Sequence, residues 1–237
     1  MPRRPRLAIT GIPWHIIQRG NNRAACFYAD DDYRYYLQTL HEQAKKYQCA
    51  LHAYVLMTNH VHLLLTPVKE GSASLLMKHL GQRYVQYINK TYRRSGTLWE
   101  GRFRSCLTRE DAYALACYRY LELNPVRAGM VHDPSNYLWS SYRKNALGDD
   151  NAILTPHCLY DELGQDAAER QAAYRALFRV HLDDKMIEDI RQATNGNYAL
   201  GNEKFRAEVE QILKRRARPG KSARPRKATE DERYKLF

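Results

Sequence analysis

Two histidines one residue apart, His60 and His62, lie in an apolar, partly β-branched run that predicts a strand over residues 60–66. Alternate residues of a strand point to the same face, so the two imidazoles share a face with their Cα atoms about 7 Å apart. Two neutral imidazoles on one face can hold a divalent metal ion. A His-x-His pair in a strand is more often two unrelated histidines. This face continues to Leu64, however, and an unpaired polar ring on an apolar face is costly, which favours ligation.

A tyrosine and an asparagine lie near the end of a helix predicted over residues 109–123. Tyr120 and Asn124 are four residues apart, which places a phenol and an amide oxygen about 40° apart on one helix face. Tyr118 falls roughly 160° away from Tyr120 and cannot share that face. A lone helical tyrosine is usually a core residue. The alternative interpretation is a nucleophile beside an oxygen ligand.

Arginines form the third candidate set. A strand predicted over residues 98–107 sends Arg102 and Arg104 to one face and Phe103 to the other. Guanidinium groups suit phosphate oxygens, although an exposed strand face with solvated arginines gives the same pattern. We also assign phosphate positioning to Arg19, Arg83, Arg127 and the N-terminal Arg3 and Arg4.

The net charge of +12 is unevenly distributed. Residues 1–142 carry 19 basic and 10 acidic groups, residues 143–213 carry 9 and 13, and residues 214–237 carry 10 and 3. Two basic regions on either side of an acidic one indicate a polyanionic partner. Of the 18 tyrosines, 14 lie in the basic first region, which favours nucleic acid over an anionic membrane, because bases stack on aromatic rings. A basic surface without specific use is the alternative.

The elements that must position these residues follow from the hydrophobic pattern. It predicts strands over 14–19, 50–57, 60–66 and 98–107 and helices over 30–47, 72–93 and 109–123, the last capped by Thr108. This order predicts an α+β fold with helices packed on an antiparallel sheet. Later segments, over 166–181, 183–194 and 202–216, are predicted to be helices, with no strand among them. Residues 214–227 hold eight basic groups, two prolines and no acid, which predicts a disordered arm.

We therefore expect one domain over residues 1–142, an all-helical extension over 143–213 and a basic tail over 214–237. Five cysteines without CxxC pairs argue against a disulfide scaffold or a zinc ribbon. No apolar run approaches the roughly 18 residues that span a bilayer, so no membrane partner is expected. The basic N-terminus has no apolar stretch behind it, which favours a cytoplasmic protein.

Two segments carry a family resemblance. Residues 57–64 (Met-Thr-Asn-His-Val-His-Leu-Leu) and residues 120–129 (Tyr-Leu-Glu-Leu-Asn-Pro-Val-Arg-Ala-Gly) resemble the REP-associated tyrosine transposases. These belong to the single-tyrosine branch of the HUH (His-hydrophobic-His) endonucleases. Supporting matches at residues 18–23, 99–105 and 139–142 occur in the family's order, so the resemblance spans about residues 14–142. Residues 143–237 resemble only the variable extension of longer members.

The resemblance implies a ferredoxin-like sheet with His60 and His62 on its central strands and Tyr120 as the nucleophile on a facing helix. Asn124 falls where related transposases place a glutamine as the third metal ligand. The implied cofactor is Mg²⁺ or Mn²⁺, which would polarise the scissile phosphate. The implied substrate is single-stranded or hairpin DNA of the REP palindrome type, cleaved through a 5′-phosphotyrosine intermediate. A monomer and a homodimer are both compatible with the sequence.

Two other functions compete with this one. The first is a DNA-hairpin-binding protein without strand cleavage, such as a domesticated regulator or host factor. The intact set of His60, His62, Tyr120 and Asn124 argues against it, because binding alone needs no nucleophile. The second is an RNA-binding or RNA-cleaving protein. An RNA 2′-hydroxyl makes a protein phosphotyrosine unnecessary for cleavage, so a covalent adduct would distinguish DNA chemistry from RNA chemistry.

Overall fold

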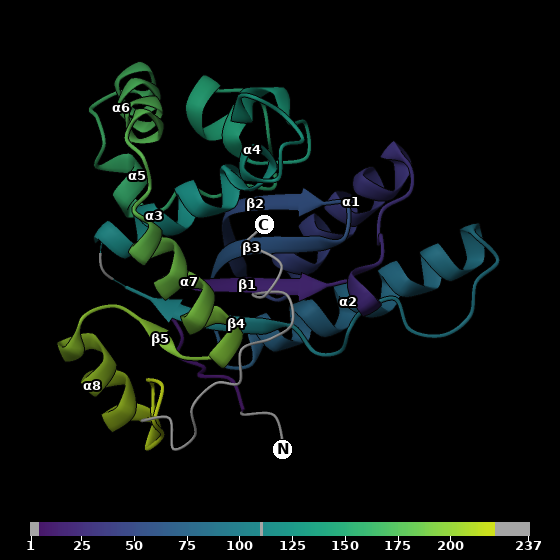
Figure 1. Ribbon diagram of the computed structural model, residues 1–237, viewed down its shortest axis with the longest axis horizontal. Coiled ribbons are helices and arrows are strands. Elements are labelled where there is room, and N and C mark those ends of the chain that lie inside the picture. Colours follow the sequence, from purple (N-terminus) through teal and green to yellow (C-terminus); the bar gives the residue numbers. More distant parts are fainter. Residues whose placement is uncertain (1–4, 110, 221–237) are drawn as a thin grey trace, which may run out of the picture.

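The computed structural model describes residues 5–109 and 111–220, and it contains one sheet with helices on both faces (Figure 1). The strands are β1 (Trp14–Arg19), β2 (Cys49–Met57), β3 (His60–Pro67), β4 (Arg104–Thr108) and β5 (Ala199–Leu200). The helices are α1 (Asp30–Lys46), α2 (Ser72–Thr91), α3 (Asp111–Glu122), α4 (Asn124–Arg127), α5 (Cys158–Asp161), α6 (Ala167–Arg179), α7 (Asp184–Gly196) and α8 (Glu203–Leu213). The predicted α+β fold with a ferredoxin-like antiparallel sheet is confirmed.

The sheet has the strand order β2-β3-β1-β4-β5. All pairs are antiparallel except β4 with β5. The β2–β3 hairpin follows from two apolar, partly β-branched runs that are separated by turn residues, and the central β1 from a short run that ends at a turn, as the sequence predicts. Because β1 and β3 are both interior strands, their side chains lie under helices on either face. The central pair can therefore present polar residues to an enclosed space.

Each face of the sheet has its own apolar cluster. α1 and α2 cover one face, where Ile16, Leu63 and Leu65 are fully buried. α3 and α7 cover the other face, where Leu64 and Cys106 are buried, and Tyr174 of α6 joins this cluster through its contact with α3. Figure 1 shows α3 and α7 in front of the strands and α1 and α2 on the far side. Within the described residues, no helix is long and apolar enough to cross a membrane.

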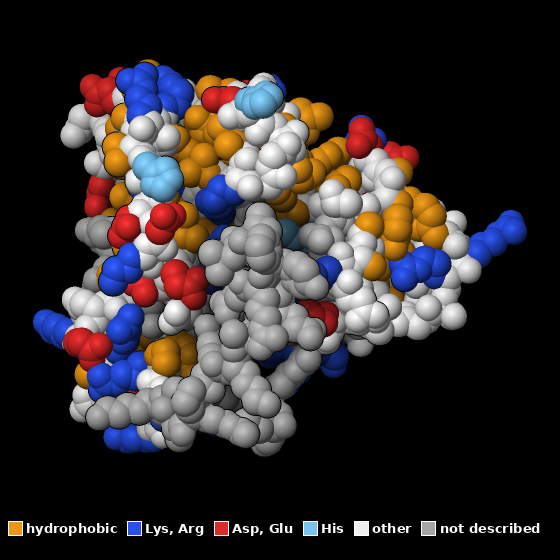
Figure 2. Space-filling model, viewed as in Figure 1, with side chains coloured by type: hydrophobic (Ala, Val, Ile, Leu, Met, Phe, Trp, Pro, Cys, Tyr) orange, Lys and Arg blue, Asp and Glu red, His pale blue; other side chains and the backbone are white. Residues whose placement is uncertain are grey.

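The segment after residue 142 is not all-helical as expected, because it also adds a strand to the sheet. Ala199 and Leu200 form β5 beside Leu107 and Thr108. A two-residue strand is too short to show alternation, so no strand was expected there. α7 packs on β4 and β1, and the extension therefore forms part of the layer that covers the sheet. Figure 2 shows acidic and basic side chains intermixed over α6, α7 and α8.

Two further expectations need correction. Thr108 does not cap α3, because its backbone N–H donates to Pro13 in the sheet and the helix begins at Asp111. The predicted disordered arm begins too early at residue 214. Ala217 is fully buried and its carbonyl accepts a hydrogen bond from Ala199, so the chain folds back onto β5. The rest of the predicted arm, from residue 221 on, lies outside the described residues.

Candidate active site

The histidine pair lies in the middle of the sheet, on the face covered by α3 and α7. β3 places His60 and His62 on that face with their ring centroids 5.1 Å apart. On the neighbouring β1, Ile17 lies opposite His62 and Arg19 lies opposite His60. The two imidazoles therefore share one surface, as strand alternation predicts.

Tyr120 approaches the histidines from the last turn of α3. Its ring centroid lies 5.7 Å from that of His62 and 5.7 Å from that of His15, edge-on to both. Asn124, the first residue of α4, lines the same cavity of about 260 Å³ together with Tyr120, His60 and His62. The structure thus brings together the four residues that the sequence singles out as nucleophile and ligands.

Both histidines are in the neutral form at pH 7. Burial, aided by the charge of Arg19, lowers the pKa of His60 to about 4. Burial also lowers the pKa of His62 well below its ordinary value, and the neighbouring His15 and His60 add to that effect. His60 Nδ1 lies 2.6 Å from Asn59 Oδ1, an oxygen that can only accept, so Nδ1 carries the proton and Nε2 keeps its lone pair. A neutral imidazole with a free nitrogen is the form that binds metals.

The residues present fit a divalent cation with mixed ligands. Within the described residues, no three His, Cys, Asp or Glu side chains are grouped so as to hold a metal. A cation beside His60 and His62 therefore needs an amide or water oxygen as well. Asn124 has such an oxygen and lines the same cavity. Imidazole and oxygen ligation together favours Mn²⁺ in vitro, while a carbonyl oxygen also suits Mg²⁺.

The sequence interpretation missed five residues that line this cavity. They are His15 and Ile17 from β1 and Arg191, Thr194 and Asn195 from α7. His15 and Thr194 are buried, while Arg191 is exposed and adds a positive charge at the cavity wall. His15 and Ile17 are two residues apart in the predicted strand and therefore share a face. This spacing is a signal that could have placed His15 beside the other histidines. No local pattern marks Thr194, because it lies 179 residues from its partner His15.

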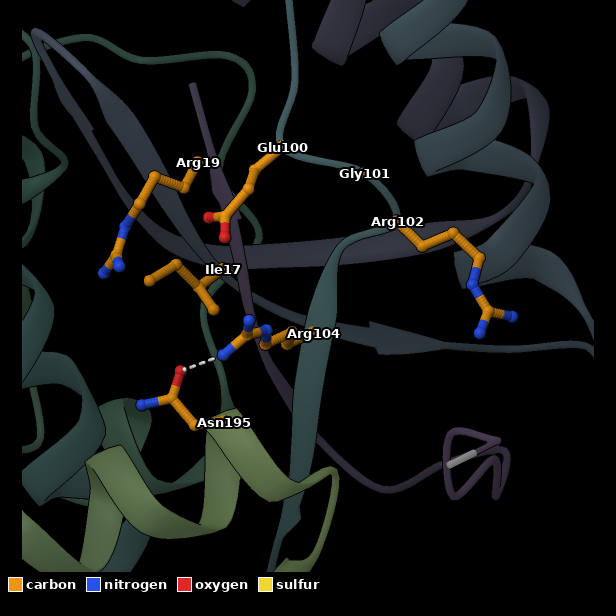
Figure 3. Close-up of a pocket in the computed structure, with 7 residues that line it drawn as sticks. All are labelled: Ile17, Arg19, Glu100, Gly101, Arg102, Arg104 and Asn195. Carbon is orange, nitrogen blue, oxygen red and sulfur yellow. Dashed lines mark hydrogen bonds between the residues drawn. The ribbon is translucent and has the colours of Figure 1, made fainter. Parts of the chain in front are cut away.

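A small cationic cleft adjoins the cavity at β1 and β4. Figure 3 shows Arg19 and Arg104 on either side of Ile17, with Glu100 above them and Asn195 of α7 below. Arg104 Nη1 donates a hydrogen bond of 2.9 Å to Asn195 Oδ1. Since Ile17, Arg19 and Asn195 line both the cleft and the cavity, the two spaces are continuous. Guanidinium groups in such a cleft suit phosphate oxygens.

The expected pairing of Arg102 with Arg104 on one strand face is wrong. β4 begins only at Arg104, and Gly101 before it has a φ of 137°, a backbone conformation that interrupts a strand. Figure 3 shows the Arg102 side chain directed toward α2, away from Arg19. Arg102 borders the same cleft as Arg104, but it also lines a groove of about 710 Å³ with Arg6 and other residues on the α2 side. The side chain of Arg104 is directed toward Asn195, and that of Arg102 toward α2.

The other predicted arginines occupy three different settings. Arg127 donates a hydrogen bond to the carbonyl of Tyr120, and its guanidinium carbon lies 4.5 Å from the centroid of the Tyr120 ring. Arg83 on α2 pairs with Glu42 at 2.5 Å, on the far face from Tyr120. Arg3 and Arg4 lie outside the described residues. Arg127 is therefore a neighbour of the tyrosine ring.

Comparison with known proteins indicates one family. A family model described as "Transposase IS200 like" matches residues 8–124, the segment that contains both histidines, Tyr120 and Asn124. A structure of a REP-associated tyrosine transposase bound to a REP hairpin superposes with a TM-score of 0.55 and 18% identity, covering 66% of this chain and 92% of that one. A crystal structure assigned as a transposase from Deinococcus radiodurans R1 has a TM-score of 0.37 and 19% identity over 48% and 91% of the two chains. No curated protein matches the chain.

Proposed function

The chain belongs to the IS200-like transposase family, and from that premise we propose that it is a metal-dependent single-stranded DNA endonuclease and strand transferase. The observation that carries the proposal is the position of Tyr120, whose ring is 5.7 Å from that of His62 in a cavity shared with His60 and Asn124. A tyrosine in a buried core needs no histidine pair beside it. A tyrosine nucleophile gains from one, because a cation held by the two imidazoles draws charge from the phosphate that the tyrosine attacks.

Tyr120 is the proposed nucleophile. Its Oη attacks the phosphorus of a DNA phosphodiester, and the bond from phosphorus to the 3′ oxygen breaks. The phenol proton is lost to solvent, the departing oxygen takes up a proton, and the products are a 5′-phosphotyrosine and a free 3′-hydroxyl. Because the phosphodiester is exchanged and not hydrolysed, a 3′-hydroxyl can later attack the linkage, rejoin DNA and release Tyr120.

His60, His62 and Asn124 are the proposed metal ligands, with the imidazoles held neutral by burial. A divalent cation at this position supplies Lewis-acid polarisation of a non-bridging phosphate oxygen. Arg127 lies over the face of the Tyr120 ring and holds the main chain at that residue, which restricts where the phenol points. Arg19 and Arg104 are placed to bind the phosphates next to the scissile one.

Hairpin DNA is the proposed substrate. The structural relative with a TM-score of 0.55 is a complex with a REP hairpin, and 92% of its chain is covered by this fold. The net charge of +12 supports a polyanionic partner. We therefore expect a short palindromic stem with an unpaired flank, whose single strand enters the cleft between Arg19 and Arg104.

The test is a covalent-adduct assay with the full chain and a library of hairpin oligonucleotides. Each oligonucleotide carries one dye at the 5′ end and another at the 3′ end, and it is incubated with Mn²⁺, Mg²⁺ or EDTA. We expect a denaturation-resistant adduct that needs the metal, keeps only the 3′ dye and maps to Tyr120 by mass spectrometry. Binding without an adduct would instead support the non-cleaving hairpin-binding protein. An adduct that keeps the 5′ dye would contradict the proposed polarity.

A further inference from the structure

Thr194 of α7 makes a set of buried hydrogen bonds behind the histidine pair. Its Oγ1 lies 2.7 Å from the carbonyl oxygen of Ile190 and 3.0 Å from Nδ1 of His15. A carbonyl oxygen can only accept, so the single hydroxyl proton of Thr194 is donated to Ile190. Thr194 Oγ1 must then accept from its other neighbours. Cys106 Sγ, 3.3 Å away, and His15 Nδ1 are therefore both donors to it.

The proton position at Thr194 determines the tautomer of His15. His15 is buried, its ring nitrogens face Thr194 and His62, and neither neighbour is a carboxylate that would offset a buried charge, so the ring is neutral and carries one proton. That proton is on Nδ1, facing Thr194, which leaves Nε2 as an acceptor. His15 Nε2 lies 2.8 Å from Nδ1 of His62. His62 must therefore donate from Nδ1, and its Nε2 is left with a free lone pair.

The same tautomer is imposed on His60 from the opposite side. Asn59 Nδ2 donates to the carbonyl of Arg23 over 3.1 Å, which fixes the orientation of the amide and directs Oδ1 at His60 Nδ1. Both members of the pair thus carry their proton on Nδ1 and keep Nε2 available. Two separate hydrogen-bond chains converge on the one protonation pattern that lets both rings bind a cation.

We propose that Thr194 and His15 are positioning residues of the metal centre, which hold His62 in the tautomer that can bind a divalent cation. The consequence is that α7, which follows the matched segment 8–124, completes the site that this segment contains. This inference rests on the proposed function only in taking His62 as a metal ligand.

The chain of hydrogen bonds from Thr194 through His15 to His62 could also carry its protons in the opposite direction, which makes the proposal testable. If Thr194 donated to His15, then His15 would donate from Nε2 to His62, and His62 Nε2 would be protonated. A protonated Nε2 has no lone pair for a metal. Removing the Thr194 hydroxyl removes the acceptor for the Nδ1–H group of His15, so the arrangement with Nδ1–H on His15 and His62 is no longer selected. The two arrangements differ only in proton positions, so the fold is the same in both.

The experiment measures the tautomers directly in the metal-free full chain. Long-range ¹H–¹⁵N correlation spectra of histidine-labelled protein distinguish Nδ1–H from Nε2–H rings. We expect His15, His60 and His62 to be Nδ1–H in the parent. In Thr194→Val we expect a mixture at His15 and His62, and a dissociation constant for Mn²⁺ at least about tenfold weaker by calorimetry. Thr194→Ser keeps a hydroxyl and is expected to restore both readouts.

Thr39→Val is the matched control, because Thr39 is a buried threonine of α1 on the far face of the sheet. It should leave the His62 tautomer and the Mn²⁺ affinity unchanged. The proposal is overturned if Thr194→Val keeps an Nδ1–H His62 and the parent affinity, or if the parent shows Nε2–H at His62. Neither readout involves DNA, so a missing Tyr120 adduct would defeat the proposed nuclease and leave this result standing.

Discussion

The two faces of the sheet contain different kinds of buried residues. On the α1 and α2 face, residues such as Leu63 and Leu65 of β3 are apolar and completely enclosed. On the α3 and α7 face, the same strand places His60 and His62 beside His15 of β1 and Tyr120 of α3. Adjacent residues of β3 therefore have different roles: one set packs in the apolar core, and the other lies beside Tyr120. Burying polar rings costs free energy, and on the α3 and α7 face several of these rings gather around one cavity.

Hydrogen bonds on the two faces differ in what they connect. On the α3 face, Glu122 is fully buried and accepts from Ser141, Asn145 and Tyr174, which ties α3 to the extension. On the α1 face, the buried carboxylate of Asp32 accepts from Tyr92 and from two backbone N–H groups at the start of α1, and Tyr84 donates to the carbonyl of Cys26. The network at Glu122 thus holds the helix that carries Tyr120, while the network at Asp32 holds the start of α1. The comparison predicts that equivalent changes on the two faces will have opposite consequences for activity and stability.

The largest expected effect comes from removing one hydroxyl on each face. Tyr120→Phe should reduce the covalent DNA adduct below detection, at least about 1,000-fold, because no other group supplies the nucleophilic oxygen. No hydrogen bond from Tyr120 Oη to another described residue is found, so the melting temperature should stay nearly constant. Tyr84→Phe should keep the adduct and lose about 1 kcal/mol of unfolding free energy, since Cys26 O loses its donor. An adduct in Tyr120→Phe would exclude Tyr120 as the nucleophile.

The next pair uses neighbouring residues of β3. His62→Ala should abolish detectable Mn²⁺ binding, because one imidazole alone is a weak ligand. Leu63→Ala, on the other face, should keep Mn²⁺ binding in the folded protein and lower the unfolding free energy by roughly 2–5 kcal/mol. Calorimetric titration and urea denaturation measure the two quantities. Equal Mn²⁺ affinities in His62→Ala and the parent would remove His62 from the proposed ligand set.

A third prediction concerns pH and Glu122. Burial raises the pKa of this carboxyl to about 7, while Ser141, Tyr174 and Asn145 oppose the shift. The folded protein therefore binds more protons than the unfolded chain between about pH 4.5 and 7, and the stability linked to Glu122 falls as the pH rises through that range. Glu122→Gln stays neutral and should gain stability relative to the parent over this range, by at most about 3 kcal/mol. Urea denaturation at pH 5, 6, 7 and 8 measures the difference.

The buried histidines of the same face act with the opposite sign. Burial lowers the pKa of His15 to about 3 and that of His60 to about 4. The unfolded chain therefore binds more protons below about pH 6.5, and the stability these rings contribute is lost as the pH falls toward 4. The histidine effect is common to parent and variant, so the difference between them isolates Glu122. A difference that does not change with pH would show that Glu122 is ionised in the folded protein at every pH tested.

The sequence predicts much of the fold and the centre of the site. The short apolar runs of β2 and β3 and the turn residues that bound them indicate strands, and the shared face of His60 and His62 then follows from strand geometry alone. Tyr120 is found because its motif resembles a known family, since a helical tyrosine by itself is most often part of a core. Both cases depend on residues that lie close together along the chain.

The remaining features depend on contacts between distant segments. Thr194 acts through His15, and no periodic pattern connects residues that are 179 positions apart. Residues 143–213, which include α7, carry more acidic than basic groups, and this charge gives no reason to place α7 beside the Tyr120 cavity. Arg102 was misplaced because the sequence pattern continues through Gly101, whose positive φ interrupts the strand. Such features are set by tertiary packing, which a single sequence does not show.

The smallest expected effect concerns two nearby arginines whose side chains point in different directions. Both border the cleft beside the Tyr120 cavity, but Arg104 donates a hydrogen bond to Asn195 there, whereas the Arg102 side chain is directed toward α2. Arg104→Gln should weaken binding of a single-stranded flank several-fold and reduce the dependence of log affinity on log salt by about 0.7, the value for one phosphate contact on a single strand. Arg102→Gln should leave binding of that flank nearly unchanged. Fluorescence anisotropy at several salt concentrations compares the two. If Arg102→Gln weakens flank binding more than Arg104→Gln does, the strand leaves the cavity toward the α2 groove, and the contrast between the two faces does not extend to DNA binding.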